Sequence, residues 1–548
     1  MLIRRGRRRW GQGGFCSSVV RKTVLIVYRM ETKTSLVKKI FLKLSPPSLR
    51  DNTAEIDRLK KQIKVELGIE SLAVPFAQIS GWVSTLRAAG YEVTTTVAMT
   101  MPLPAVIELE AGDTTRRNFG LAVDLGTTRM AYQLWDLAQG KLLVETSSEN
   151  PQTRFGADIL TRIHYADHPD RLKDLQACVV SEINDTLLNL GREYHLSPRE
   201  IFTMTLAGNT TMTHLFLGLS PASICREPYI PVLNTIEPLT AQDLGLNIHP
   251  RAVVSIFPNV GSYLGGDVLA GILHSRLYQQ EALSMLVDVG TNAEVVFGNS
   301  EWLIGCAGAA GPALEGGVAQ MGMVAGDGAI EKIRIDPETE ELSYSLIGQG
   351  PPRGICGSGL IDLTAELFMA GLLDIRGKFT VKKPTDRWIK LDGQPAYVLV
   401  RAEETANHSP IVLTQVDLDI LLRSKAAMYT ILTTLVQSVG YSLKDIEHFF
   451  VAGAFGNHID PRRAVILGLL PDLPLERYIP LGNTSLKGAA DVLLDYRSLE
   501  GVKKIADKIT YLEMNVNQDF MNRFSAARFI PHTDPNLFPS VRRDVDFL

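Results

Sequence analysis

The sequence predicts an α/β protein in which a large two-lobed domain follows a smaller α/β unit. Three observations support this prediction. From residue 119 onward, strand-like runs alternate with helical segments, which is typical of α/β folds with a mixed or parallel sheet. An apolar strand ending in Asp-x-Gly-Thr occurs twice at distant positions, and a glycine-bearing turn follows a third strand near residue 453.

The composition is that of a globular protein with several domains. The chain has 548 residues, of which 45% are hydrophobic and 21% are charged, so it is long enough to bury several cores. A net charge of −4 argues against a general nucleic-acid-binding protein. No stretch reaches the roughly 18 uninterrupted apolar residues of a membrane-spanning helix. We therefore expect neither nucleic acid nor a membrane among its partners.

The cysteines indicate a reduced, cytoplasmic protein. None of the five belongs to a C-x-x-C pair, so the sequence predicts no disulfide framework. Clustered ligands for a structural zinc ion or a conventional iron–sulfur site are missing for the same reason. The five residues are Cys16, Cys178, Cys225, Cys306 and Cys356.

Breaks in composition divide the chain into four segments. The first contains five arginines before residue 10, and we interpret it as a ragged or truncated start. Paired prolines at 46 and 47 precede a helical pattern over 51–68. A helix near 79–89 and strands over 91–99 and 105–110 then predict a small α/β domain. The expected segments are an N-terminal piece (1–35), a linker (36–68), a small α/β middle domain (69–115) and the two-lobed domain (118–548).

The two Asp-x-Gly-Thr strings are candidate phosphate-binding hairpins. They read GLAVDLGTT at 120–128 and LVDVGTNAE at 286–294. Glycine lets a backbone turn tightly and bring its N–H groups against a phosphate, and threonine and asparagine add side-chain donors. The candidate phosphate ligands are therefore Gly126, Thr127, Thr128, Gly290, Thr291 and Asn292.

The aspartates of these strings are candidate catalytic and metal-binding residues. Asp124 and Asp288 would repel a phosphate directly, but they can hold a Mg²⁺ ion that neutralises it, through water. Two such hairpins facing each other would clamp a triphosphate between two lobes. The alternative is that both strings are ordinary hairpins with aspartate caps.

A third element completes a superfamily pattern. Residues 448–460 read HFFVAGAFGNHID, in which a strand over 449–451 is followed by Gly453 and Gly456. Both glycines allow close approach to a nucleotide. The three elements in this order resemble the actin, sugar-kinase and Hsp70 superfamily of ATPases. The resemblance implies a two-lobed ATPase domain that binds ATP with Mg²⁺.

Two further features are candidate parts of the site. Asp267 lies in a Gly-Gly-Asp string at an expected helix start, where it would orient a water as a general base or simply cap the helix. Gly357, Ser358 and Gly359 form a loop that enters a helix, and such a loop can bind an anion.

Several strings resemble one family more closely. They include NPQ at 150–152, AGNTTMTH at 207–214, GICGSGLID at 354–362 and GN at 482–483. With residues 47–59 they resemble the reductive activators of corrinoid proteins, over about residues 36–548. The resemblance implies an ATPase that drives a low-potential electron onto the Co(II) corrinoid of a partner protein, giving Co(I) for methyl transfer. It leaves a homodimer open.

The sequence departs from this family at its N-terminus. Many members carry a [2Fe-2S] ferredoxin domain there, but its C-x₄-C-x₂-C…C ligands are absent, and Cys16 with its neighbours is at most a remnant of the cluster loop. Three explanations remain. The gene start or frame is wrong, the redox module is a separate polypeptide such as a ferredoxin, or the protein has lost electron transfer and acts as an ATPase or regulator.

Other functions remain open at this stage. A small-molecule kinase or another ATPase of the superfamily would share the fold. A degenerate, non-enzymatic binding module is disfavoured by the intact phosphate strings. An activator that shares a [4Fe-4S] cluster across a dimer would need two cysteines per chain, for which Cys306 and Cys356 are the candidates. His214 is interpreted as a buried helical histidine, with a metal or cobalt ligand as the alternative.

Overall fold

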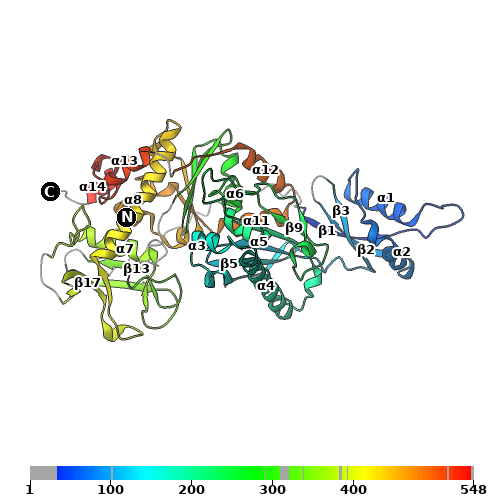
Figure 1. Cartoon of the computed structure of the whole chain (residues 1–548), viewed down its shortest axis with the longest axis horizontal. Coiled ribbons are helices and arrows are strands. Elements are labelled where there is room, and N and C mark those ends of the chain that lie inside the picture. The colour runs from blue at the N-terminus through cyan, green and yellow to red at the C-terminus, as the bar shows by residue number, and fades with distance from the viewer. Residues whose placement is uncertain are drawn as a thin grey trace, which may run out of the picture. The chain divides into compact units, whose positions relative to one another are not determined.

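Two six-stranded sheets form the large domain (Figure 1). The computed structural model describes residues 34–99, 103–290, 292–308, 320–336, 339–381, 386–391, 393–514 and 518–544. The first sheet has the order β6-β5-β4-β7-β9-β8, and the second has the order β20-β19-β10-β11-β12-β21. The first comprises β4 (Phe119–Leu125), β5 (Arg129–Asp136), β6 (Lys141–Glu149), β7 (Ile201–Gly208), β8 (Leu239–Thr240) and β9 (Val253–Ile256). The second comprises β10 (Ser284–Val289), β11 (Ala293–Gly298), β12 (Leu303–Gly308), β19 (His448–Ala452), β20 (Tyr478–Gly482) and β21 (Ile509–Tyr511).

The two sheets repeat one arrangement at their centres. Strand β4 pairs antiparallel with β5 and parallel with β7, and β10 pairs in the same way with β11 and β19. Asp124 and Asp288 each stand near the end of the central strand of the three. Both Asp-x-Gly-Thr strings therefore form the tips of equivalent hairpins, as their sequence predicts.

Three helices lie between the sheets: α6 (Gly266–Ser275), α11 (Thr484–Leu494) and α12 (Ser498–Lys508). Their apolar residues share one core with Ala122 and Ala207 of the first sheet and with Leu286 and Phe450 of the second. Helices α6 and α11 also pack closely against each other, and Figure 1 shows both near the middle of the large domain. This core connects the two lobes.

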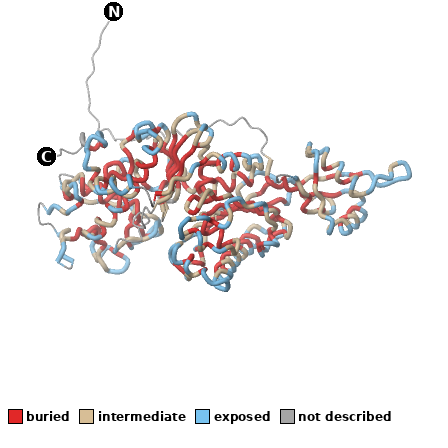
Figure 2. The backbone as a smooth tube through the Cα atoms, turned by 45° about the horizontal axis from the view of Figure 1, so that its top comes forward, coloured by how far each residue is buried: buried red, intermediate tan, exposed pale blue. Residues whose placement is uncertain are grey.

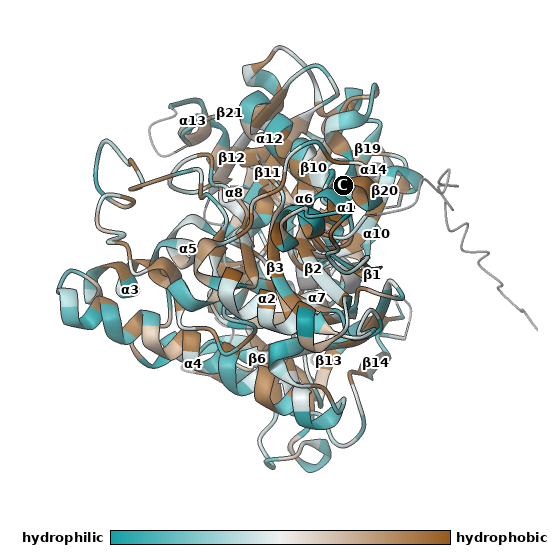
Figure 3. Ribbon diagram, turned by 90° about the vertical axis from the view of Figure 1, so that its right-hand side faces the viewer, coloured by the Kyte–Doolittle hydropathy of each residue, from teal (hydrophilic) through white to brown (hydrophobic). Residues whose placement is uncertain are grey.

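Further helices cover the outer faces of the two sheets. Helix α4 (Pro169–Glu193) buries one stripe that includes Leu175, Val179, Ile183 and Leu187, the spacing of a helix with one apolar face. Figure 3 shows hydrophobic and hydrophilic residues alternating along it, and Figure 2 shows that the central strands are buried. Helix α5 (Thr210–Leu217) packs beside α4, and α7 (Gly357–Met369), α8 (Gln415–Ser438) and α10 (Pro461–Leu467) pack around the second sheet. The remaining α-helices of the large domain are α3 (Ile159–Tyr165), α9 (Gly453–His458), α13 (Gln518–Ala527) and α14 (Pro539–Asp544).

Two small sheets extend the second lobe. Their order is β14-β13-β15 and β16-β17-β18, and their buried residues join the core of the second six-stranded sheet. The strands are β13 (Ala329–Ile335), β14 (Leu342–Leu346), β15 (Gly354–Ile355), β16 (Trp388–Leu391), β17 (Gln394–Val400) and β18 (Ile411–Thr414).

The N-terminal part of the described chain folds into a small α/β unit. It consists of β1 (Val37–Lys43), α1 (Glu55–Leu67), α2 (Ile79–Ala88), β2 (Glu92–Ala98) and β3 (Ala105–Ala111). The expected helices and strands of this region are confirmed, and α1 ends at Gly68 with φ +65°. Strand β1 pairs along its whole length with β2. Segments that the sequence analysis divided into a linker and a middle domain thus share one sheet and one core.

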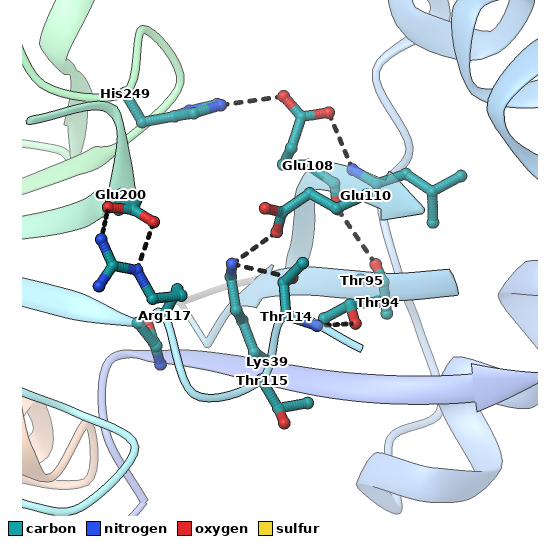
Figure 4. A network of polar contacts seen from close by, with 12 residues as sticks. Lys39, Thr94, Thr95, Glu108, Glu110, Thr114, Thr115, Arg117, Glu200 and His249 are labelled. Atoms are coloured by element: carbon teal, nitrogen blue, oxygen red, sulfur yellow. Dashed lines mark hydrogen bonds and ion pairs between the residues drawn. The ribbon is translucent and has the colours of Figure 1, made fainter. Parts of the chain in front are cut away.

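Polar contacts, shown in Figure 4, and a small apolar cluster attach the small unit to the first lobe. Glu108 on β3 accepts hydrogen bonds from His249 (3.0 Å) and Arg251 (2.8 Å) of the first lobe. Burial would raise the pKa of Glu108, but hydrogen bonds from His249 and a backbone amide, with the charge of Arg251, lower it to about 2. Val37 and Ile107 bury an apolar patch against Phe202. The interface is therefore both charged and closely packed.

Two sequence expectations concern features outside this fold. The expected N-terminal piece lies outside the described residues, apart from its residues 34 and 35. Within the part of the chain that the structure describes, every helix is too short or too polar to cross a membrane.

Candidate nucleotide-binding site

Three aspartates from distant segments meet where the two lobes face each other. Asp124 lies near the end of β4, Asp288 near the end of β10, and Asp267 in the first turn of α6. Burial, together with the charge of Asp124, raises the pKa of Asp267 to about 7. Burial and the charges of Asp267 and Asp124 likewise raise the pKa of Asp288 to about 7. Asp267 and Asp288 therefore both lie close enough to Asp124 for its charge to act on them, and all three residues are only partly buried.

The Asp124 carboxylate is held by the N-terminal end of α11. Asn483 Nδ2 donates to Asp124 Oδ2 at 2.8 Å, and Ser485 Oγ donates to Oδ1 at 2.7 Å. Burial raises the pKa of Asp124, while these two hydrogen bonds act in the opposite direction. Both carboxylate oxygens thus have a fixed orientation before any ligand binds.

Two further residues hold the loop of the first hairpin through three hydrogen bonds. Asn150 Nδ2 donates to the Gly126 carbonyl at 2.8 Å, and the Asn150 backbone N–H donates to the Thr128 carbonyl at 2.8 Å. Asn209 Nδ2 donates to Thr127 Oγ1 at 3.1 Å. A β-carbon at Gly126 would overlap the carbonyl at the far side of the turn, so this turn requires glycine.

The second hairpin has a loop one residue shorter than the first, and its aspartate again lies near the end of its strand. Asp288 faces Glu294 across the pair of strands, and the Gly290 N–H donates to the Asn292 carbonyl at 2.9 Å. Thr291, the remaining candidate phosphate ligand, lies outside the described residues. The structure therefore places five of the six candidate phosphate ligands in the two hairpin loops.

The glycine-bearing turn after β19 lies directly against the second aspartate. Gly453 has φ +81°, and a β-carbon there would lie 2.7 Å from Asp288 Oδ1 and 2.9 Å from the Val289 carbonyl. A β-carbon at Gly456 would lie 2.6 Å from the Val451 carbonyl. Close packing therefore requires glycine at both positions, and a larger residue at 453 would collide with the Asp288 carboxylate.

The other anion-loop candidate is buried beneath β13. Gly357, Ser358 and Gly359 form the first turn of α7, and Ser358 Oγ lies 3.3 Å from Cys356 Sγ. A β-carbon at Gly359 would overlap the Ile330 carbonyl, so packing explains this glycine. Helix α7 also contacts α9, which begins at Gly453. An anion-binding role for this turn stays a prediction.

Other singled-out residues have structural roles. Both ring nitrogens of the buried His214 are hydrogen-bonded, to the Thr210 carbonyl at 2.7 Å and the Val232 N–H at 3.1 Å. This accounts for His214 without a metal or cobalt. Asp158 caps α3 on the surface. Asp267 is not the cap of α6, because that position belongs to Gly265.

The described residues do not fit an iron–sulfur cluster. Cys178, Cys225, Cys306 and Cys356 are all free thiols, and Cys16 lies outside the described residues. Burial raises the pKa of the Cys306 thiol, which opposes the thiolate form that metals bind. Within the described ranges, no three histidine, cysteine or acidic side chains are grouped to hold a metal ion directly.

Sequence reasoning missed the side chains that hold the first hairpin. Asn150, Asn209 and Asn483 occur in the family-like strings but were given no role there, and Ser485 lies outside those strings. The groups that these four side chains contact lie up to several hundred residues away in the chain. A weak signal existed for the asparagines, since each directly precedes a helical turn. Such a residue is normally interpreted as a cap and nothing more.

Repeated hairpins, facing carboxylates and helices packed between two sheets define a two-lobed ATPase domain of the actin, sugar-kinase and Hsp70 type. Family models agree with this class. Residues 31–116 match the RACo linker region, 119–280 the RACo middle region, and 282–542 the C-terminal domain of RACo, the ASKHA domain. The linker model covers both segments that we divided at residue 68, and the middle model covers the first lobe.

Individual relatives agree as well. The chain is 32% identical over 414 residues to the corrinoid activation enzyme RamQ of Eubacterium limosum, covering 74% of this chain and 69% of the relative. It is 25% identical over 435 residues to a Co(II) methylated amine-specific corrinoid protein reductase of Methanosarcina barkeri, covering 74% and 75%. A solved reductive activator for corrinoid, iron-sulfur protein matches with a TM-score of 0.87 and 38% identity, covering 94% of this chain and 82% of that one. The chain belongs to the RACo family of reductive corrinoid activators.

Proposed function

We propose that this protein couples ATP hydrolysis to the reduction of a partner corrinoid protein from Co(II) to Co(I), the state that accepts a methyl group. The relatives named above are by name corrinoid activators and a Co(II) corrinoid protein reductase, and the ASKHA domain supports the use of ATP. The observation that carries the proposal to this chain is that Asp267 of α6 lies close to the two hairpin aspartates, Asp124 and Asp288. The small α/β unit, which a simple kinase does not need, supports an activator over a small-molecule kinase.

The donor set fits a nucleotide with its magnesium ion. Three partly accessible carboxylates repel one another in a poorly hydrated place, and a divalent cation relieves that repulsion. Oxygen ligands suit Mg²⁺, which usually keeps several of its waters. We propose that Asp124 and Asp288 hold the ion through water, and that Asp267 orients the attacking water. When bound, Mg²⁺ neutralises charge on the phosphates.

The remaining candidates complete this proposed site. The loops at 126–128 and 290–292 supply N–H groups and hydroxyls to the phosphates, and Gly453 and Gly456 admit the adenosine. Residues of both lobes therefore contact one nucleotide. Binding would draw the lobes together around the core that contains α6 and α11, because each lobe gains contacts only when the other approaches.

The free energy that such a closure can supply is large enough to drive the reduction of the corrinoid. Shifting a two-state equilibrium from 1:99 to 99:1 takes about 5.5 kcal/mol of differential binding. At roughly 59 mV per tenfold for one electron, this equals about 240 mV. An activator that binds and releases its corrinoid partner in step with ATP turnover can therefore drive an otherwise uphill one-electron transfer.

The electron must come from a donor outside the described residues. Because the four described cysteines do not fit a cluster, we propose that a separate reduced ferredoxin supplies the electron to the Co(II) centre. One ferredoxin is then oxidised for each Co(I) formed. A homodimer remains part of the proposal, and light scattering of the purified protein measures it directly.

An anaerobic visible-spectrum assay tests the proposed function. The protein is mixed with a Co(II) corrinoid protein, a low-potential reductant and a ferredoxin, with and without ATP. Co(I) is expected to appear only when ATP and this protein are both present. Omitting the ferredoxin decides whether the electron source is separate. ATP hydrolysis without any Co(I), across several corrinoid partners, would contradict the proposal.

A further inference from the structure

Three asparagines share one unusual arrangement around the first hairpin. Each caps the N-terminal end of a helix or helical turn with its side-chain oxygen. Asn150 Oδ1 accepts from the Gln152 N–H, Asn209 Oδ1 from the Met212 N–H, and Asn483 Oδ1 from the Leu486 N–H, each at 2.9 Å. The capped elements are the 3₁₀ turn at Pro151–Arg154, α5 and α11.

The same side chains contact the hairpin with their amide nitrogens. Because the oxygen of each amide is committed to a cap, the NH₂ group faces the other way, toward residues 124–128. The targets are the Gly126 carbonyl, Thr127 Oγ1 and Asp124 Oδ2. Three separate elements are thus each connected to the segment 124–128 by the side-chain amide of an asparagine.

Each of these bonds fixes a group that the proposed site uses. An amide N–H can only donate, so Asn483 holds Asp124 Oδ2 as an acceptor and fixes the direction in which this carboxyl oxygen points. The carbonyl of Gly126 and the N–H of Thr127 belong to one planar trans peptide, in which they point in opposite directions. Because Asn150 donates to the Gly126 carbonyl and fixes its direction, the Thr127 N–H points to the opposite side of the loop.

Capping alone does not explain why all three residues are asparagine. Aspartate and serine cap helices about as well. At 150 and 483 aspartate lacks the donor that the Gly126 carbonyl and the Asp124 carboxylate require, and at 209 it would keep only a bond accepted from the Thr127 hydroxyl. Serine is too short to cap and reach across at once. Asparagine alone among good caps satisfies both requirements. Ser485 adds a fourth bond, to the other oxygen of Asp124.

We propose that Asn150, Asn209 and Asn483 are positioning residues for ATP turnover, which hold the first hairpin in its phosphate-binding geometry. This inference rests on the proposed function. The three residues act through Asp124, Gly126 and Thr127. They make the first hairpin a preorganised surface whose geometry is set by three helix N-termini.

Asparagine-to-aspartate variants separate the two roles. Asn150→Asp, Asn209→Asp and Asn483→Asp keep the cap and remove the donor, and Asn→Ser variants at the same positions repeat the test without added charge. We expect the kcat of ATP hydrolysis to fall about 10- to 100-fold, as for other supports of metal-binding groups. ADP affinity, measured by calorimetry with Mg²⁺, should change far less. Hydrogen exchange in residues 124–130 should accelerate while the thermal midpoint stays near that of the wild type.

The control is the opposite substitution, aspartate to asparagine, at the cap of another helix. Asp158→Asn alters the exposed cap of helix α3, where the Asp158 carboxylate accepts from the Thr161 N–H at 2.9 Å, and should leave kcat unchanged. Wild-type kcat in both the Asp and Ser series would overturn the inference while the proposed function stands. A fall in kcat that only tracks a lower thermal midpoint would also overturn it. A wild-type protein that neither binds nor hydrolyses ATP would instead overturn the proposed function, and this inference with it.

Discussion

Gly488 of α11 lies against the backbone of Ala270 in α6, so closely that a β-carbon at 488 would overlap the Ala270 carbonyl. The first turn of α6 carries Asp267, and the residues that hold Asp124 lie at the start of α11. The spacing of these two helices therefore sets the spacing of two of the three aspartates. A substitution that moves α6 and α11 apart should therefore disturb the aspartate site, although the substituted residue does not contact the aspartates.

Gly488→Ala is accordingly expected to lower both stability and turnover. Overpacking costs about 1–3 kcal/mol, and displacing catalytic groups by about 1 Å can reduce a rate roughly 100-fold. Thermal unfolding and phosphate release measure the two effects. Gly81→Ala in α2 is the matched helical control, because a β-carbon there meets nothing within 4 Å. Normal turnover in Gly488→Ala would show that the helix spacing does not control the site.

Removing either hairpin aspartate should abolish ATP turnover. Asp124→Ala and Asp288→Ala each delete a carboxylate that we assign to Mg²⁺, and we expect a loss of at least about 100-fold in kcat. Phosphate release at saturating ATP is the measurement. The surface aspartate Asp158 provides the control, since Asp158→Ala removes only an exposed helix cap. If both hairpin variants turned over normally, the phosphate assignment would be wrong.

Gly453 tests how closely the adenosine turn and Asp288 must pack. In Gly453→Ala the new methyl group would lie 2.7 Å from Asp288 Oδ1, in addition to the left-handed backbone cost of about 1 kcal/mol. Gly440 has nearly the same φ, +80° against +81°, but open space around it. Gly440→Ala therefore carries the backbone cost alone. We expect nucleotide affinity, measured by calorimetry, to fall in the first variant and not in the second.

Local patterns in the sequence were sufficient to predict both hairpins and most elements of the small unit. The turn at Gly126 and the helix stop at Gly68 follow from residues within a few positions of each glycine. The predicted superfamily is confirmed by the ASKHA match over residues 282–542, whereas the roles of the three nucleotide elements stay predictions. What the sequence predicted well is therefore what neighbouring residues determine.

Contacts between distant segments could not be predicted in the same way. Asn483 and Asp124 are far apart in the chain, and their hydrogen bond exists because α11 packs between the two sheets. Strand β1 reads as a linker, since its partner β2 begins nearly fifty residues later. Pairing partners depend on the whole fold, and a propensity or a motif reports only the local segment.

Glu108 makes the attachment of the small unit sensitive to acid. Its pKa is about 2 in the folded protein against an ordinary value of 4.5. A depressed folded pKa means that the stabilisation is fully present above pH 4.5 and is lost as the pH falls toward 2. The difference corresponds to roughly 3 kcal/mol. The facing groups are His249, Arg251 and the Trp82 indole, which donates to Glu108 Oε1 at 3.0 Å.

Glu108→Gln should therefore lower the free energy of unfolding by up to roughly 3 kcal/mol at pH 7, and by progressively less below pH 4.5. Urea unfolding followed by tryptophan fluorescence measures this, because Trp82 lies within the contact. Glu92→Gln is the control, since Glu92 pairs with Lys43 on the exposed side of the same sheet and should contribute less than about 1 kcal/mol. If wild type and Glu108→Gln differed by the same amount at pH 7 and pH 3, the charge of Glu108 would not stabilise the interface. Since β3 and the first lobe share this carboxylate, the variant should also loosen the small unit before the two six-stranded sheets unfold.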